Sequence, residues 1–438
     1  MVKVQLFQIN FSNPSKVFLA GQVVSGQVVL QLREPTKLNA IKLHLQGKGK
    51  VHWRVTKGSG NNRRTVHYRA EEVYFDQIVL LYGNNQAQAV THPGGRHEYP
   101  FHFQMRANLP SSFEGEHGYV RYFCKAFMDR PWKYNHESKH AFTVINTLDL
   151  NNEPALMNPI QGSQSSEVSC LCCASGNVSA SMKVERQGYA PGEEIRIWGE
   201  VRNNSNSSVQ RVEATLTQHV TFYGKSDSMF SSGRFKEKEV KQVVASHTKG
   251  LIPEQNVQVW DGVCMRIPSV PPSRLQGCNI INITYRICVR VDVPYGTDIK
   301  IGSEIVVGTV PFRAPPPPAS SLPPSYTLAL NAPQPVPSAP PITTQPGAIA
   351  SAPPFSGYDE APPPSYEECV FGRVHIKDDQ DTDHTTGQFE FAPVYPTFRS
   401  VYNNGASTSA QPYEPPPAPP SAPPEAPSAP PPPDDNCI

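Results

Sequence analysis

Short stretches of alternating apolar and polar residues recur through the larger, N-terminal part of the chain. Residues 41–46 and 194–201 alternate as a strand does when one of its faces is buried. Residues 73–81 are rich in β-branched and aromatic residues, and residues 280–287 alternate again. The Gly- and Asn-rich residues 58–62 separate two strand-like runs and predict a hairpin tip. Many short strands between turns, with no long amphipathic helix, indicate β-sandwiches rather than βαβ units.

A weak internal repeat indicates two similar sandwiches in tandem. Residues 18–21 (Phe-Leu-Ala-Gly) precede one Val-rich strand, and residues 189–192 (Tyr-Ala-Pro-Gly) precede another strand. Each unit would hold roughly 140–150 residues, a size that supports a single hydrophobic core. We therefore expect one domain at residues 1–150 and a second at residues 177–313, with a polar connector at residues 151–176 between them.

The composition changes near residue 313, where a strand-like run gives way to proline. Of the 47 prolines, 33 lie from Pro311 onward. Such a segment cannot bury enough apolar surface to offset its conformational entropy, so we expect residues 314–438 to form a disordered proline-rich tail. Residues 370–376 and 389–391 are locally apolar and are the two places where a short piece of the tail could still dock.

Several stretches match one protein family in order along both halves. They are residues 18–22, 109–115, 117–122 and 129–133 in the first half, and residues 188–193, 200–205 and 307–311 in the second. Through these stretches the chain resembles the arrestin family, specifically its arrestin-domain-containing branch, the α-arrestins. The resemblance implies an all-β fold of two tandem immunoglobulin-like β-sandwich arrestin domains, and it implies scaffolding rather than catalysis.

The tail contains two Pro-Pro-x-Tyr motifs. Their defining residues are Pro323, Pro324 and Tyr326, then Pro363, Pro364 and Tyr366. Paired prolines preform a polyproline II helix that fits between the aromatic rings of a WW domain, while the tyrosine enters a neighbouring pocket. Chance yields about 0.4 such motifs in a tail of this composition. The tails of α-arrestins typically carry these motifs, so the resemblance implies HECT-type ubiquitin ligases with WW domains as partners.

Three Pro-Ser-Ala-Pro tetrapeptides also occur in the tail. They consist of Pro337, Ser338, Ala339 and Pro340, of Pro420, Ser421, Ala422 and Pro423, and of Pro427, Ser428, Ala429 and Pro430. Similar motifs bind the ubiquitin-variant domain of the ESCRT-I sorting complex. The alternative is a solvated proline-alanine spacer, and the last two copies lie in one repetitive segment.

These features predict an adaptor that links membrane receptors or transporters to ubiquitin ligases, and so promotes ubiquitination, endocytosis and endosomal sorting. It would act by raising the effective concentration of the ligase beside the cargo. We expect it in the cytoplasm, recruited to the plasma membrane and endosomes.

Two other functions remain open. One is thioredoxin binding, which a branch of the family performs through a cysteine shortly before a tryptophan. Here no cysteine stands just before Trp260, and Cys264 follows it. The other is the work of a receptor-signalling arrestin, but the tail has no clear clathrin-box pattern.

The nine cysteines are too few and too scattered for a disulfide framework. Cys170, Cys172 and Cys173 form a cluster that is either structural, S-acylated as a weak membrane signal, or metal-binding. The metal site has the least support, because no second Cys or His pair stands at the spacing of a zinc finger.

Nothing resembles a signal peptide and no window approaches 18 uninterrupted apolar residues, so we expect a soluble intracellular protein.

The net charge of +1 gives no reason to expect nucleic acid as a partner. Six basic residues surround the predicted hairpin: Lys48, Lys50, Arg54, Arg63, Arg64 and Arg69. They form either a solvated rim or a contact for acidic or phosphorylated cargo tails or anionic lipid. His92, His97 and His102 have a spacing that matches no metal motif. We expect no metal or other cofactor, and no catalytic motif indicates an enzyme.

Overall fold

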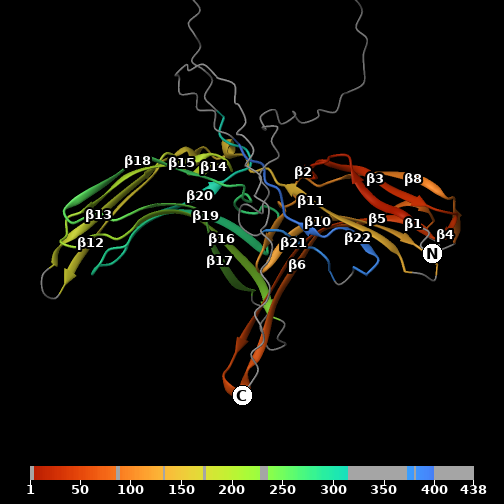
Figure 1. Cartoon of the computed structure of the whole chain (residues 1–438), viewed down its shortest axis with the longest axis horizontal. Helices are drawn as coiled ribbons and strands as arrows, with labels where there is room; N and C mark the ends of the chain where they lie inside the picture. Colours follow the sequence, from red (N-terminus) through yellow and green to blue (C-terminus); the bar gives the residue numbers. More distant parts are fainter. Residues whose placement is uncertain are drawn as a thin grey trace, which may run out of the picture. The chain divides into compact units, whose positions relative to one another are not determined.

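The structure is a computed structural model that describes residues 4–84, 89–131, 134–170, 174–226, 235–313, 372–378 and 381–398. These residues belong to one compact unit. Strands dominate them, and the helices among them are short 3-10 turns (Figure 1). No helix in this part of the chain is long and apolar enough to cross a membrane.

The first domain is a β-sandwich. Its elements are β1 (Val4–Phe11), β2 (Val17–Leu19), β3 (Val23–Leu32), β4 (Thr36–Leu38), β5 (Ala40–Lys57), η1 (Gly60–Asn62), β6 (Arg64–Gly83), β7 (Val90–His92), β8 (Gly95–Gln104), β9 (Phe113–Gly115), β10 (Gly118–Asp129) and β11 (His136–Ile145). A sheet of β1, β3 and β8 faces a larger sheet in which β6, β5, β10 and β11 are neighbours. Phe11 and Phe142 join the two layers, with ring centroids 5.9 Å apart.

The second domain repeats this plan. Its elements are η2 (Leu150–Asn152), η3 (Pro154–Met157), β12 (Ile160–Cys170), β13 (Ala174–Val184), β14 (Gly188–Tyr189), β15 (Glu194–Asn203), β16 (Val212–Ser226), β17 (Phe235–Lys249), β18 (Asn256–Arg266), β19 (Ile281–Val291) and β20 (Ile299–Val307). One sheet has the order β12-β13-β15-β18, and the other runs β14-β20-β19-β16, with β17 paired to β16. Along β19 every second residue from Ile281 to Val291 is buried, as the alternating sequence predicts.

The two domains share one continuous sheet. β16 pairs with β6 through Lys225↔Arg69 and Ser226↔Tyr68. Beside this junction the ring of Phe222 from the second domain lies 5.6 Å from the ring of His117. Backbone hydrogen bonds and apolar packing therefore both cross the boundary between the domains.

The predicted internal repeat is confirmed by matching details in both domains. β2 runs parallel to β11, and β14 runs parallel to β20. Each short strand is followed by a glycine in the left-handed region, with φ of 87° at Gly21 and 92° at Gly192. Each domain also buries a tyrosine hydroxyl on a proline carbonyl, Tyr122 on Pro110 at 2.7 Å and Tyr285 on Pro271 at 2.6 Å.

Two sequence expectations need adjustment. The expected connector at residues 151–176 contains β12, which pairs with β13 along its whole length and belongs to the second domain. The prediction of a disordered tail is wrong for residues 372–378 and 381–398, which dock on the first domain through β11 and an apolar cluster, over a longer stretch than the two pieces where docking was left open. The docked region includes β21 (Val374–His375), β22 (Thr385–Gln388) and β23 (Glu390–Phe391).

The buried hydroxyl of Tyr285 gives a direct test of the second core. It donates to Pro271 O and accepts from Gln218 Nε2 at 2.7 Å, so Tyr285→Phe leaves two buried polar groups unpaired. We expect a loss of about 1–3 kcal/mol in the free energy of unfolding. Tyr122→Phe leaves only the Pro110 carbonyl without a partner, so it should lower the free energy of unfolding by less. Urea denaturation of both variants measures the difference, and equal losses would contradict this account.

Candidate functional site

A segment of the tail, residues 372–398, lies along the outer edge of β11 in the first domain. β22 pairs with β11 in parallel, from Glu137↔Thr385 to His140↔Gln388 (Figure 1). β2 pairs with the following part of the same edge, from Thr143 to Ile145. An edge strand exposes unpaired backbone groups, so the tail segment and β2 together complete the sheet at β11.

Apolar contacts hold the beginning of this docked segment. β21 and β23 pair with each other at Val374↔Phe391. This pairing presents Ile376 and Phe391, both buried, to Phe123 and Ala141 of the first domain. These side chains come from the two apolar stretches at which the sequence left docking open.

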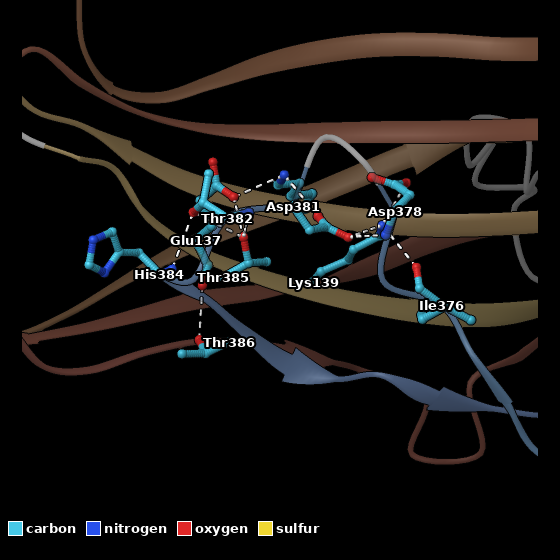
Figure 2. A network of polar contacts seen from close by, with 10 residues as sticks. Glu137, Lys139, Ile376, Asp378, Asp381, Thr382, His384, Thr385 and Thr386 are labelled. Atoms are coloured by element: carbon cyan, nitrogen blue, oxygen red, sulfur yellow. Dashed lines mark hydrogen bonds and ion pairs between the residues drawn. The ribbon is translucent and has the colours of Figure 1, made fainter.

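A buried ion pair lies at the centre of the docked segment (Figure 2). The Lys139 side chain is 1% exposed, and its Nζ contacts Asp381 at 2.7 Å and Asp378 at 2.9 Å. Nζ also donates to Ile376 O at 3.3 Å and lies 4.5 Å from the centre of the Phe123 ring. The Asp381 side chain is fully buried. A buried charge is tolerated only when it is paired and hydrogen-bonded, so a segment that covers Lys139 must supply acidic partners.

Lys125 extends the network to the neighbouring strand β10. Its Nζ lies 2.9 Å from Glu137 and 3.0 Å from Asp381. Burial alone would lower the pKa of Lys125, but hydrogen bonds to Glu137 and Asp381 outweigh burial and raise it. At Asp381 burial acts to raise the pKa, and the hydrogen bond from Lys139 leads the contacts that bring it below its usual value. Both groups are therefore charged in the docked state at neutral pH.

Two threonines of β22 fix the register on Glu137. Thr385 donates its hydroxyl to the Glu137 carboxylate at 2.5 Å, and Thr386 donates to the Glu137 carbonyl at 2.9 Å (Figure 2). The Glu137 N–H donates in turn to His384 O at 3.3 Å. Side-chain and backbone groups of one β11 residue thus recognise three successive residues of the tail.

The close approach of the two strands depends on Gly387. Its φ is +126°, and a Cβ at this position would lie 2.1 Å from Lys139 O. Any other residue would force β22 away from β11. Gly387 is thus suited to the docked state by both backbone conformation and space.

The last part of the docked segment reaches the second domain. Tyr395 is 1% exposed and donates its hydroxyl to Ser112 O of the first domain at 2.8 Å. Its carbonyl accepts from Ser269 Oγ of the second domain at 2.7 Å. The Phe398 N–H donates to Pro191 O at 2.7 Å, beside Gly192. One tail segment therefore contacts both sandwiches.

Most residues predicted to bind partners lie outside the described part of the chain. This holds for both Pro-Pro-x-Tyr motifs, the three Pro-Ser-Ala-Pro motifs, and Cys172 and Cys173. Cys170 ends β12, where it pairs in register with Ala174. The proposed S-acylation of this cluster stays a prediction.

The basic residues near the hairpin are not the ones that contact the acidic residues of the docked tail segment. Lys48, Lys50 and Arg54 lie on β5, and Arg63, Arg64 and Arg69 lie at the start of β6 or just before it. All but Lys48 are exposed. The bound acidic segment instead contacts Lys125 and Lys139, which sequence reasoning missed.

One signal could have pointed to the docked region. No proline occurs between Pro364 and Pro393, so this window differs in composition from the rest of the tail.

Two of the three regularly spaced histidines lie in contact with each other. His92 and His97 pack edge to face, with ring centroids 4.5 Å apart, and His92 Nδ1 contacts Pro93 O at 2.8 Å. Burial, the largest influence, lowers the pKa of His92. Among the described residues no three His, Cys, Asp or Glu side chains gather closely enough to hold a metal ion.

The stretch considered for thioredoxin binding lies on β18. Trp260 is buried, and Cys264 is exposed on the same strand. Partial burial and the carboxylate of Glu194 raise the pKa of the Cys264 thiol. A raised pKa disfavours the thiolate, which is the form that reacts with disulfides.

Two tandem sandwiches with this strand arrangement define an all-β protein with two domains. Comparison with known proteins identifies its family. The model of the arrestin (or S-antigen) N-terminal domain matches residues 7–151, and that of the C-terminal domain matches residues 174–312. The chain belongs to the arrestin family, in its arrestin-domain-containing branch.

Several known proteins align with about 70% of this chain. Arrestin domain-containing protein 17 of Caenorhabditis elegans is 33% identical over 321 residues, which cover 71% of this chain and 72% of that protein. Thioredoxin-interacting protein of Homo sapiens is 30% identical over 312 residues, covering 70% of this chain and 75% of the relative. Its counterpart in Mus musculus is 29% identical over 309 residues, covering 70% and 74%.

The buried ion pair predicts that docking of the tail segment depends on the Asp381 carboxylate and not on that of Asp383. Asp381→Asn leaves the buried Lys139 ammonium with Asp378 as its remaining carboxylate partner. This loss should weaken docking by about 3 kcal/mol, or roughly 100-fold. Asp383→Asn makes the same chemical change at a fully exposed side chain and should leave docking intact. Hydrogen exchange of residues 381–398 is the measurement. Equal protection in the two variants would show that the ion pair does not hold the segment.

His140, on β11 under the docked strand, predicts a pH dependence. Burial, helped by Lys16, lowers its pKa from about 6.5 to about 4 in the folded protein. Because the unfolded chain then binds the proton more readily, stability is lost as pH falls from about 6.5 to about 4. The loss should reach about 2 kcal/mol between pH 7 and pH 5.

Unfolding free energies at these two pH values test this effect. His140→Gln should reduce the difference by about 2 kcal/mol, whereas His375→Gln, at an exposed position of the tail, should leave it as in the parent. A difference that is as large in His140→Gln as in the parent would assign the pH effect to other groups.

Proposed function

We propose that this protein is an adaptor that delivers WW-domain ubiquitin ligases of the HECT type to membrane cargo. The observation that carries the proposal is the joining of an arrestin domain pair to a tail with two Pro-Pro-x-Tyr motifs. Proteins of this family generally act as adaptors rather than enzymes.

The chemistry of the tail supports the choice of partner. The polyproline segments bind with little loss of conformational entropy, and each tyrosine adds a directional contact. The two tyrosines are 40 residues apart in the sequence, so one ligase with several WW domains can engage both motifs. Cargo held by the domain pair would then be ubiquitinated because the ligase is concentrated beside it.

The remaining tail motifs extend this proposal to sorting. The tetrapeptides ending at Pro340, Pro423 and Pro430 have the composition that ESCRT-I recognises. An adaptor with both kinds of motif would act first at the plasma membrane and then at endosomes. Cargo binding, ubiquitination and sorting would in this way be linked in one chain.

Thioredoxin binding is the second candidate, because two of the relatives are named thioredoxin-interacting protein. The cysteine that the branch places before its tryptophan has no counterpart before Trp260, and the raised pKa of Cys264 opposes disulfide exchange. The ligase adaptor is therefore the better supported function.

The adaptor function predicts the effect of three tyrosine substitutions. Tyr326→Ala and Tyr366→Ala should each weaken the binding of purified tandem WW domains at least about tenfold, because each removes one arm of a bivalent contact worth about 10²–10⁴. The double variant should lose binding almost entirely. Tyr358→Ala, a tyrosine outside both motifs, is the matched control and should bind as the parent does. Unchanged affinity in the double variant would refute the proposed function.

A further inference from the structure

The hairpin formed by β5 and β6 is strongly basic. Residues 48–70 hold seven lysines and arginines and no aspartate or glutamate, whereas the whole chain has a net charge of only +1. The seven are Lys57 and the six basic residues near the hairpin that were named above. The positive charge of the hairpin is therefore not balanced by acidic residues of its own, and the rest of the chain is acidic overall.

The outer part of the hairpin extends beyond its neighbouring strands (Figure 1). β10 pairs with β5 only up to Val51, and β16 pairs with β6 only at Tyr68 and Arg69. From there the two strands pair with each other as far as Lys57↔Arg64. In the described part of the chain the hairpin thus ends as a two-stranded ribbon, with no strand paired to either of its sides.

An aromatic pair fixes the base of this ribbon. Trp53 and Tyr68 are each 5% exposed, and their rings stack with centroids 5.1 Å apart at an interplanar angle of 12°. The Trp53 ring lies against Gly224 of β16, where an added Cβ would be 2.7 Å from it. The ribbon therefore leaves the sheet from a packed base to which both domains contribute.

The basic side chains point in different directions along the ribbon. Side chains of directly paired residues share a face, and consecutive residues of a strand alternate between faces. Lys57 and Arg64 are paired with each other, whereas Arg54 lies on the opposite face and Arg63 ends the 3-10 turn at the tip. A pocket for a single phosphate needs donors that converge on one point. These donors diverge, so the tip suits an extended negative surface.

A bilayer with anionic lipid is such a surface. Each basic residue close to it strengthens binding about fivefold, and the attraction decays within a Debye length of about 8 Å. Lys57, Arg63 and Arg64 are near enough to one another to act on one patch of headgroups, and Val55, 37% exposed on the face of Lys57, adds an apolar contact. Lys50 precedes Lys57 by seven residues, or about 23 Å along a strand. It is too far back to contribute when the ribbon meets the membrane with its tip.

We propose that the tip of the β5–β6 hairpin binds the headgroups of anionic lipids and holds the protein at the membrane surface by itself. This inference goes beyond the proposed function, because it requires neither a ligase motif nor cargo. Attraction to the bilayer brings the domain pair to the plane in which membrane cargo moves. A weak contact with cargo is then sufficient, since one molecule binds lipid and cargo at the same time.

Sedimentation of the full chain with lipid vesicles tests the proposal. One set of vesicles is phosphatidylcholine alone, and the other contains phosphatidylcholine and phosphatidylserine in equal parts. The tip variant combines Lys57→Gln, Arg63→Gln and Arg64→Gln, which removes three exposed charges and keeps long polar side chains. The turn glycines of the hairpin are unchanged.

Two further chains serve as controls. The matched control removes the same number of charges from exposed positions of the second domain, through Lys183→Gln, Arg266→Gln and Lys300→Gln. The charge-preserving variant, Arg63→Lys with Arg64→Lys, changes the same tip without removing charge.

The parent should bind the anionic vesicles and not the neutral ones, and it should lose binding as the salt concentration is raised. The tip variant should bind the anionic vesicles about 100-fold more weakly, because three contributions of about fivefold are lost. The matched control and the charge-preserving variant should bind within about twofold of the parent. Hydrogen-exchange protection of β5 and β6 verifies that the hairpin stays formed in every chain.

Two single changes separate the position of a charge from its number. Arg64→Gln at the tip should weaken binding to the anionic vesicles about fivefold. Lys50→Gln, at an exposed position of the base, should leave binding as in the parent. Equal losses in the two variants would show that the tip is not the point of contact.

Other results would overturn the proposal outright. These are equal binding of neutral and anionic vesicles, or a tip variant that binds as the parent does. A multiply phosphorylated peptide that binds the parent but not the tip variant, without any binding of vesicles, would assign the tip to cargo tails instead. Binding of tandem WW domains should be the same in every chain, so failure of the proposed function in that assay is distinct from failure of this one.

Discussion

The buried ion pair between Lys139 and Asp381 is the interaction on which the described tail depends. Lys139 belongs to β11, and its ammonium is almost completely removed from water. Replacing its partner by a neutral group would leave a buried charge, which costs several kcal/mol. The docked state of this edge therefore depends on the two aspartates that precede β22. Hydrophobic packing at Ile376 and the hydroxyls of the two β22 threonines add register and direction to that requirement.

The domain pair provides the frame for this contact. Each sandwich repeats a short parallel strand, a left-handed glycine and a buried tyrosine, and one sheet passes between them from β6 to β16. The docked segment uses both halves of the repeat, since Tyr395 and Phe398 reach the second domain beside Gly192. A contact made far along the chain is thus supported by elements of both domains.

The sequence predicted most of the fold because strand periodicity and turn chemistry are local signals. The alternation around Ile41 and Ile281, and the glycine-rich hairpin tip, correspond directly to strands and turns in the structure. β12 was missed because its Ser- and Gln-rich sequence resembles a linker and becomes a strand only through pairing with β13. The network at Lys139 and Asp381 was missed for a different reason. Nothing local indicates that two charges 242 residues apart will be buried together.

The separation of β22 from β11 has a consequence for biosynthesis. Thr385 is made 248 residues after Glu137, its partner on β11. At about 5–20 residues per second, the ribosome needs about 12–50 s to supply that distance. During this interval the first part of the outer edge of β11 has no strand to pair with, and Lys139 must stay hydrated. The nascent first domain therefore passes through an aggregation-prone stage, in which chaperones that bind exposed strand edges would protect it until the tail emerges.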